Sequence, residues 1–274
     1  MAIVAALLSS AMYGIADFLG GKYSKRLPVT FVVGVSQFFG LLTAIAVAMA
    51  THSAWDSRAI PHAMLASVAG FLGLMMFYQA LATGRMGIVS PIASLGVLVP
   101  LGVGLVHGEI PRAVQIIGII LAIVGIVLAS GPELSGASDS RPVFLAVGAA
   151  VGFGTCFVFI ADGSYYSVAT TMIVMRLQTV PIAIVIALLT KSFAKPSRKE
   201  VGWLAVIGAL DNGANLAMGY ATTLGMLTIV SVLASLYPVV TVLLAWWLLR
   251  ERLLVVQYVG IATALLGVCA ITAG

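Results

Sequence analysis

Apolar runs, each close to the length that crosses a lipid bilayer, fill most of this chain and leave only short polar breaks between them. A membrane-spanning helix needs about 20 mainly apolar residues, and the pattern predicts ten such helices. Their expected ranges are 2–21, 29–50, 62–83, 87–106, 113–131, 142–161, 168–190, 201–223, 226–249 and 255–273. Because the runs are apolar on every side, they do not fit the alternating strands of a membrane barrel.

The composition excludes a soluble or a disordered protein. Apolar residues make up 61% of the chain and charged residues only 8%, whereas soluble domains carry about 25% charged residues. The net charge of +5 comes from basic residues in the polar breaks, which is typical of cytoplasmic loops rather than of a face that binds nucleic acid. We expect a lipid bilayer and a small-molecule substrate as partners and no nucleic acid. A monomer and a homodimer both fit the sequence.

The two halves of the chain resemble each other. The segment GRMGIVSPIASL (84–95) aligns with GMLTIVSVLASL (225–236) at an offset of 141, with seven identities in twelve positions. The string E-x5-Q-x2-G-x6-G begins at Glu109 and again at Glu251, an offset of 142. Two polar positions also recur at the offset of 141, Thr30 and Gln37 with Thr171 and Gln178. A nearly constant offset in several places predicts a duplicated five-helix unit.

An odd number of helices in each unit makes the second copy enter the membrane from the opposite face. We therefore expect two inverted repeats, 1–131 and 142–274, joined by a polar linker at 132–141. Inverted repeats are typical of secondary transporters, whose substrate site lies at the repeat interface near the bilayer midplane. The expected fold is all-α, with ten transmembrane helices in two inverted five-helix repeats around a central cavity. A duplicated scaffold that transports nothing is the alternative.

The paired E-x5-Q-x2-G-x6-G strings and the paired IVSPIASL and IVSVLASL strings suggest a family. In these features the chain resembles the EamA-type, ten-helix members of the drug/metabolite transporter superfamily over essentially its whole length. The resemblance implies a cavity enclosed by the first four helices of each half, with the fifth and tenth helices peripheral. It also implies export, in some relatives import, of amino acids and other small metabolites. Relatives often carry Trp-Gly in the first helix, where this chain has Tyr13-Gly14.

Basic residues divide unequally between the polar breaks, which bears on orientation. The odd-numbered loops hold eleven Lys and Arg, the even-numbered loops hold Arg58 and Arg112, and Arg176 lies within a helix. By the positive-inside rule, the odd-numbered loops are cytoplasmic and both termini lie outside. Many relatives place their termini inside, so the charge count and the resemblance disagree, and we follow the count. The expected location is the cell (inner) membrane.

Polar residues within the apolar runs are the candidate site. An ionisable group at membrane depth costs about 2.5–3.5 kcal/mol on insertion scales, which makes each one a functional candidate. Asp211 lies near the middle of its expected helix, and Asn215 follows one turn later on the same face. Asp211 is also the first proton-coupling candidate, and a purely structural clamp between helices is the alternative. The predicted substrate-binding set is Tyr13, Tyr78, Gln79, Ser90, Asp211, Asn215, Tyr220 and Ser231.

Three more charged residues lie within the expected helices or at their ends. Asp17 and Asp162 share the tripeptide Ile-Ala-Asp, and each lies near the end of its helix. Asp17 is a second proton-coupling candidate, with an interfacial ion pair as the alternative. Arg176 is expected in the same half of the membrane as Asp162, which predicts a structural ion pair between them. Binding of a substrate carboxylate by Arg176 is the alternative.

Other chemistries lack their residues. His52, His62 and His107 all lie in expected loops, so the helices offer neither a paired-histidine metal site nor a Ser-His-Asp set. No P-loop is present, and we expect no cofactor. Cys156 and Cys269 lie in apolar runs, where a disulfide is not expected.

The sequence thus predicts a secondary transporter and not an enzyme. We expect an exporter of amino acids or similar small metabolites that works by alternating access, with proton coupling as an added hypothesis. A facilitator or an importer on the same fold is the first alternative. An integral-membrane enzyme acting on a lipid is the alternative from another class. The nine acidic residues disfavour that enzyme because they are scattered, whereas such enzymes need clustered carboxylates or histidines.

Overall fold

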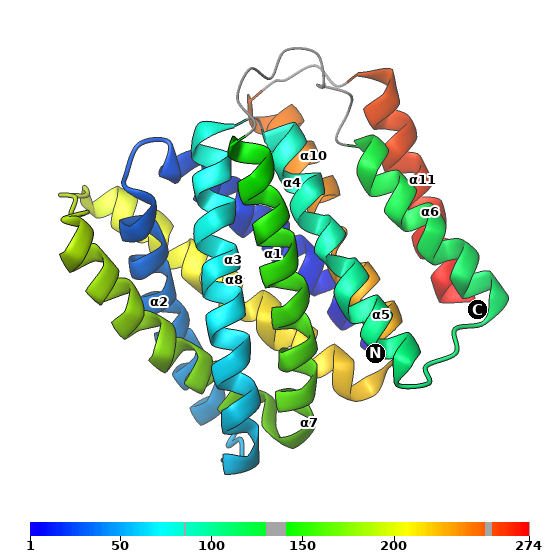
Figure 1. Ribbon diagram of the computed structural model, residues 1–274, viewed down its shortest axis with the longest axis horizontal. Coiled ribbons are helices and arrows are strands. Elements are labelled where there is room, and N and C mark those ends of the chain that lie inside the picture. The colour runs from blue at the N-terminus through cyan, green and yellow to red at the C-terminus, as the bar shows by residue number, and fades with distance from the viewer. Residues whose placement is uncertain (85, 130–140, 250–253, 274) are drawn as a thin grey trace.

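The computed structural model describes the whole chain except residues 85, 130–140, 250–253 and 274. The described residues form helices and no strand (Figure 1). The first half contains α1 (Ala2–Ser24), α2 (Val29–Ala50), α3 (Ile60–Thr83), α4 (Met86–Ser94), α5 (Leu98–Val106) and α6 (Ala113–Ala129). The second half contains α7 (Arg141–Thr190), α8 (Arg198–Leu224), α9 (Leu227–Ala234), α10 (Tyr237–Leu249) and α11 (Val255–Ala273). Two short 3-10 helices are η1 (Ser57–Ala59) and η2 (Leu95–Val97).

The outer surface has the character of a membrane protein. In the part of the chain that the structure describes, four segments are long and apolar enough to span a bilayer, namely α1, α2, the run Ser57–Thr83 and α7. Large apolar side chains such as Ile117, Leu188 and Leu189 point outward and are exposed. In water such a surface would drive aggregation, whereas in a bilayer lipid tails cover it. The predicted class, an all-α integral membrane protein, is confirmed.

Most helices begin and end within a few residues of the expected positions, and three regions differ. The expected helix 87–106 is divided into α4, η2 and α5, and the expected helix 226–249 is divided into α9 and α10. The expected helices 142–161 and 168–190 both fall within α7, where the backbone of Ser167 is not helical (φ −163°, ψ 115°). The predicted linker at 132–141 lies almost wholly outside the described residues.

The chain folds back at the Ser167 kink, as Figure 1 shows near the α7 label. Helix α3 contacts both arms of α7. Gly73 lies against Phe153 in the first arm, and the Ser67 hydroxyl donates to the Met175 carbonyl in the second arm at 3.1 Å. Ser67 and Gly73 are less than two turns apart, whereas Phe153 and Met175 would be about 33 Å apart in a straight helix at 1.5 Å per residue. The two arms of α7 therefore act as two separate helices in the packing.

The two divided helices are broken at matching points, and each break packs on a glycine. The first break follows Ser94 and the second follows Ala234. A Cβ atom added to Gly154 would overlap the Gly96 carbonyl at the first break, and one added to Gly14 would overlap the Tyr237 carbonyl at the second. Glycine is needed at both positions because no side chain fits between the two backbones.

The Glu of the first E-x5-Q string explains part of that motif. Glu109 accepts hydrogen bonds from the backbone N–H groups of Leu227 and Thr228, at 2.7 and 2.8 Å. These are the first two residues of α9, whose N–H groups have no partner within the helix. A carboxylate from one half of the chain therefore caps a helix of the other half. Glu251, the matching residue, lies outside the described residues.

The Gln residues of both strings bind backbone groups at the beginning of α6 and α11, and the Gly residues allow these two helices to pack closely. Gln115 accepts a hydrogen bond from the backbone N–H of Arg112, and Gln257 does the same for Leu254, at 2.9 and 2.8 Å. Two glycines let these helices touch, since a Cβ on Gly125 would overlap Ala264 and one on Gly267 would overlap Ala122. The α6–α11 pair lies at one side of the molecule (Figure 1), the peripheral place that the resemblance implies.

Candidate functional site

A buried cavity lies between α1, α2, α3, both arms of α7, α8 and α10, so both halves of the chain contribute to it. Its volume is about 50 Å³, room for roughly three or four water molecules. Seven polar or charged non-aromatic side chains line it: Asp17, Gln37, Ser67, Arg176, Thr179, Asp211 and Asn215. Five aromatic side chains complete most of the wall: Tyr13, Phe71, Phe153, Phe157 and Tyr237. A solute larger than a few waters requires these walls to separate.

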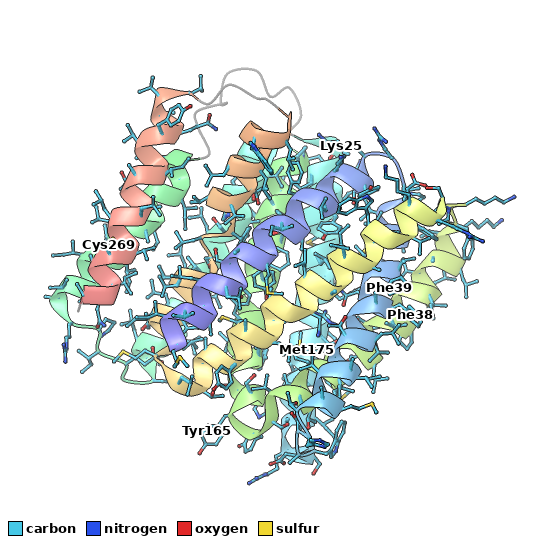
Figure 2. All side chains as sticks on the ribbon, turned by 180° about the vertical axis from the view of Figure 1, so that it is seen from behind. Lys25, Phe38, Phe39, Tyr165, Met175 and Cys269 are labelled. Carbon is cyan, nitrogen blue, oxygen red and sulfur yellow. The ribbon has the colours of Figure 1, made fainter. Side chains whose placement is uncertain are left out.

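Arg176 is the centre of the polar wall. Its guanidinium is 4% exposed and comes from the second arm of α7, which Figure 2 marks by the neighbouring Met175. The Nη2 atom lies 2.9 Å from Oδ2 of Asp211, out of line for a hydrogen bond, so this contact is an ion pair. The Nε atom donates to Oδ1 of Asn212 at 3.3 Å, and Nη1 donates to Oε1 of Gln37 at 2.5 Å.

Gln37 joins the arginine to the carboxylate. Its Oε1 also accepts a hydrogen bond from the Thr179 hydroxyl at 3.2 Å, and its Nε2 donates to Oδ2 of Asp211 at 3.3 Å. One turn along α8, the Asn215 amide donates to the Asp211 backbone carbonyl at 2.7 Å. The network thus connects α2, α7 and α8, and its charges compensate each other at a depth where a lone charge would be costly.

Asp17 lies on a different wall of the same cavity and has no such partner. Its side chain is 7% exposed, and no hydrogen bond or ion pair to its carboxyl group occurs within the described residues. Tyr13 precedes it by one turn on the same face of α1, and the ring of Tyr78 rests against Gly20 one turn further on. The Tyr237 hydroxyl, which Asp17 influences electrostatically, also has no hydrogen-bond partner in the described part of the chain.

Aromatic rings surround Tyr13. It stacks on Phe157 with ring centroids 5.9 Å apart and meets Tyr237 edge-on at 6.3 Å. Phe77 extends the cluster to Tyr237 at 6.5 Å. A carboxyl group beside electron-rich ring faces is a setting that favours an organic cation or an amine. The polar wall, by contrast, presents a guanidinium that favours an anion.

The structure brings some of the predicted site residues together and separates others. Tyr13, Asp211 and Asn215 line the cavity, as does Asp17. Tyr78 is buried against α1, Ser90 and Ser231 are buried, and Tyr220 is 55% exposed. None of these four, nor Gln79, is among the cavity-lining residues described here. Their roles in substrate binding stay predictions.

The predicted ion pair between Arg176 and Asp162 is not observed. Arg176 pairs with Asp211 in the cavity, whereas Asp162 is near the Ser167 kink with its Oδ2 atom 3.8 Å from Nδ1 of His62. The prediction was based on the expected presence of both residues in the same half of the membrane, but Asp162 is 42% exposed at its side chain whereas Arg176 faces the cavity. The same tripeptide Ile-Ala-Asp in two helices does not place its aspartate at the same depth in the membrane when the helices end at different points.

Gln37, Ser67 and Thr179 are polar cavity residues that the sequence did not assign to the site. Gln37 had a signal, because it is a long polar side chain within an apolar run and it recurs as Gln178 at the repeat offset. Thr179 had none, since single threonines are common in membrane helices. Within the described residues no group of three or more His, Cys, Asp or Glu side chains could hold a metal ion.

Comparison with known proteins agrees with this architecture. A model of a family described as EamA-like transporters matches residues 1–131 and, separately, residues 140–273. The uncharacterized protein MJ1333.1 of Methanocaldococcus jannaschii is 26% identical over 132 residues, which cover 47% of this chain and 96% of that protein. A solved structure titled only "Crystal structure of protein" superposes with a TM-score of 0.74 at 17% identity, covering 97% of this chain and 96% of its own. At that identity the superposition shows the fold alone.

Proposed function

Because the chain belongs to the EamA-like transporter family, we propose that it is a secondary transporter that exports amino acids or similar small metabolites through the central cavity. The family is of the drug/metabolite transporter type and carries small solutes across membranes. The observation that carries the proposal is the cavity itself, which is lined by both halves of the chain and holds charges of both signs. An enclosed charged site between two halves suits a solute that must be released on either side.

We infer ten membrane crossings in two inverted repeats. The kink at Ser167 supports this count because it divides α7 into two crossings. The matched breaks after Ser94 and Ala234, each packed on a glycine, support equivalent roles for the two halves. The family model matches each half separately, and the relative MJ1333.1 has the length of one half. Alternating access would rock one five-helix unit against the other and separate the cavity walls.

A zwitterionic solute fits the two walls. Its amine would meet the unpaired Asp17 carboxyl among the aromatic rings. Its carboxylate would meet Arg176, whose Nη2 atom has no hydrogen-bond partner in the described residues. Asn215 would bind a polar group of the solute near this wall. The sequence made Asp211 the first candidate for proton coupling. In this proposal Asp17 takes that role: it binds the solute amine and, in the absence of solute, the competing proton. The Asp211 carboxylate already lies 2.9 Å from Arg176 and accepts a hydrogen bond from Gln37, so it is less available than Asp17 to the amine of a solute.

For orientation we keep the charge-based proposal: odd-numbered loops in the cytoplasm, both termini outside and the cell (inner) membrane as location. Reporter fusions after Met1 and Gly274 test it. Signals from a cytoplasm-active reporter at both ends would reverse it without affecting the cavity proposal.

Transport is tested with purified protein in liposomes. Counterflow of labelled amino acids should occur with the wild-type chain, and a pH gradient should drive accumulation if a proton competes with the amine at Asp17. Asp162→Asn is the matched control, because it removes a carboxylate that lies near the Ser167 kink and does not line the cavity. Absence of flux for every amino acid tried would refute the amino-acid assignment. Flux that does not depend on the pH gradient would refute proton coupling and indicate a facilitator.

A further inference from the structure

A second concave site lies apart from the central cavity, where the end of α1 meets the beginning of α8 and the end of α10. Its volume is about 530 Å³. Phe18, Leu19, Lys22 and Tyr23 line it from α1, and Arg26 from the turn that follows α1. Ser197, Lys199, Glu200, Trp203 and Leu248 line it from the other two elements. Figure 2 shows α1 and α8 side by side, with Lys25 marking the end of α1 at this edge of the molecule.

The charges of this groove favour an anion. Lys22, Arg26 and Lys199 are all exposed, and no ion pair involving any of them occurs in the described part of the chain. The one acidic residue, Glu200, is already engaged. Its Oε2 atom accepts hydrogen bonds from the backbone N–H and the hydroxyl of Ser197, at 2.7 and 2.9 Å, which cap α8. Three cations thus face the groove against one committed carboxylate.

The groove also changes from charged to apolar along the helix axis. Along α1 the lining residues run from Phe18 to Lys22, about 6 Å at 1.5 Å per residue, and Arg26 follows just beyond the end of the helix. Phe18 and Leu19 form its floor, Leu248 is an exposed apolar residue on its side, and Trp203 is 39% exposed. Tryptophan and tyrosine are enriched at the level where headgroups meet acyl chains. This gradient matches an amphipathic ligand whose phosphate lies among the cations and whose tails run along the apolar end.

We propose that this groove binds an anionic diacyl phospholipid, one molecule seated between α1, α8 and α10. A free soluble anion would account for the cations and not for the apolar end. A neutral lipid would explain the apolar end but not the three cations that have no ion-pair partner among the described residues. Basic pockets between transmembrane helices are suited to acidic headgroups. The inference concerns a surface away from the cavity, so it does not depend on the proposed transport.

The experiment uses the tryptophan that lies in the groove as the reporter. The chain has four tryptophans, and replacing Trp55, Trp246 and Trp247 with phenylalanine leaves Trp203 alone. The full chain is placed in liposomes that contain increasing fractions of phosphatidylglycerol or phosphatidylcholine with brominated tails, which quench nearby tryptophan. We expect brominated phosphatidylglycerol to quench Trp203 at a lipid fraction about tenfold lower than brominated phosphatidylcholine.

Two triple variants separate the groove from general surface charge. Replacing Lys22, Arg26 and Lys199 with glutamine should remove the preference for phosphatidylglycerol. Replacing Lys25, Lys191 and Lys195 with glutamine removes three exposed cations that do not line the groove, and should leave the preference in place. Equal quenching by the two lipids, or equal loss in both triple variants, would overturn the proposal. Loss of the preference on adding inorganic phosphate at constant ionic strength would also overturn it, by assigning the groove to free phosphate.

Discussion

The two carboxylates of the central cavity have opposite surroundings. Asp211 is bound on its side chain by Arg176 and Gln37, in a network that crosses three helices. Asp17 faces the same cavity from α1 with aromatic neighbours and with no hydrogen bond or ion pair among the described residues. A carboxylate that is already engaged by neighbouring side chains stabilises the packing of its helices, whereas a carboxyl group without such partners is free to meet a bound cation or a proton. We therefore assign structure to the Asp211 wall and chemistry to Asp17.

The strongest challenge to this division is to remove Arg176. Arg176→Met leaves Asp211 as an unpaired buried charge and should lower the free energy of unfolding by about 3–5 kcal/mol. Thermal unfolding in detergent measures the loss. Adding Asp211→Leu removes the orphaned charge, and the double variant should recover most of the stability. Additive losses in the double variant would show that the two residues do not act as a pair.

Gln37 should have the next largest effect. Gln37→Leu removes the acceptor of the Arg176 Nη1 atom and a donor to Asp211. The Arg176–Asp211 ion pair remains, and loss of a hydrogen bond to a charged group costs about 1.5–3 kcal/mol of the free energy of unfolding, again measured by thermal unfolding. Gln178→Leu is the matched control, since Gln178 is the repeat counterpart and does not line the cavity. An equal decrease in the free energy of unfolding in both variants would show that the hydrogen bonds of Gln37 do not stabilise the protein more than those of a glutamine outside the cavity.

Asp17→Asn should reverse the pattern, with little change in stability and a large change in transport. No hydrogen bond or ion pair of the described residues is lost, so the free energy of unfolding should change by less than about 1 kcal/mol. In liposomes the variant should still exchange solute but lose accumulation driven by a pH gradient, because its amide cannot release a proton. A wild-type response to the gradient in this variant would remove Asp17 from any coupling role.

Asn215 should show the smallest effect. Asn215→Ala removes an amide that lines the cavity, and one lost hydrogen bond of about 0.5–1.5 kcal/mol weakens solute affinity about 2- to 10-fold. The pH response should be unchanged, since Asp17 is intact. Concentration dependence of counterflow gives the affinity. Unchanged affinity would show that the solute does not contact this part of the polar wall.

Helix positions were predictable from sequence because a run of about 20 apolar residues rarely folds as anything but a membrane-spanning helix. The breaks had a local signal, since Pro100 and Pro238 each remove the helical hydrogen bond to the residue four positions earlier, Gly96 and Ala234. The packing of the two breaks on Gly154 and Gly14 from distant segments was not predictable. Hydropathy gives no information on such long-range packing. The sequence predicted a non-helical loop between residues 161 and 168, whereas in the structure only Ser167 is non-helical. The polar residues before it stay helical because tertiary packing can override a weak helix propensity.

For the cavity, membrane depth identified three of the lining residues, whereas the one predicted ion pair was wrong. Asp211, Asn215 and Asp17 were candidates because charged and amide groups are costly in a bilayer, and all three line the cavity. The partner of Arg176 was assigned by position along each helix, and that criterion chose Asp162 over Asp211. Pairing depends on the rotation of α7 against α8, and that rotation is set by packing. Sequence spacing in one chain does not reveal it.

Access to Cys156 tests the central claim, that solute passes through the cavity by alternating access. Cys156 lines the cavity and is 4% exposed, and the only other cysteine of the chain is Cys269. With Cys269→Ser, a charged, membrane-impermeant methanethiosulfonate can modify only Cys156. Applied to vesicles of right-side-out and of inside-out orientation, the reagent should modify Cys156 from both sides, and transported solute should slow the reaction. Modification from one side alone, or from neither, would contradict the account.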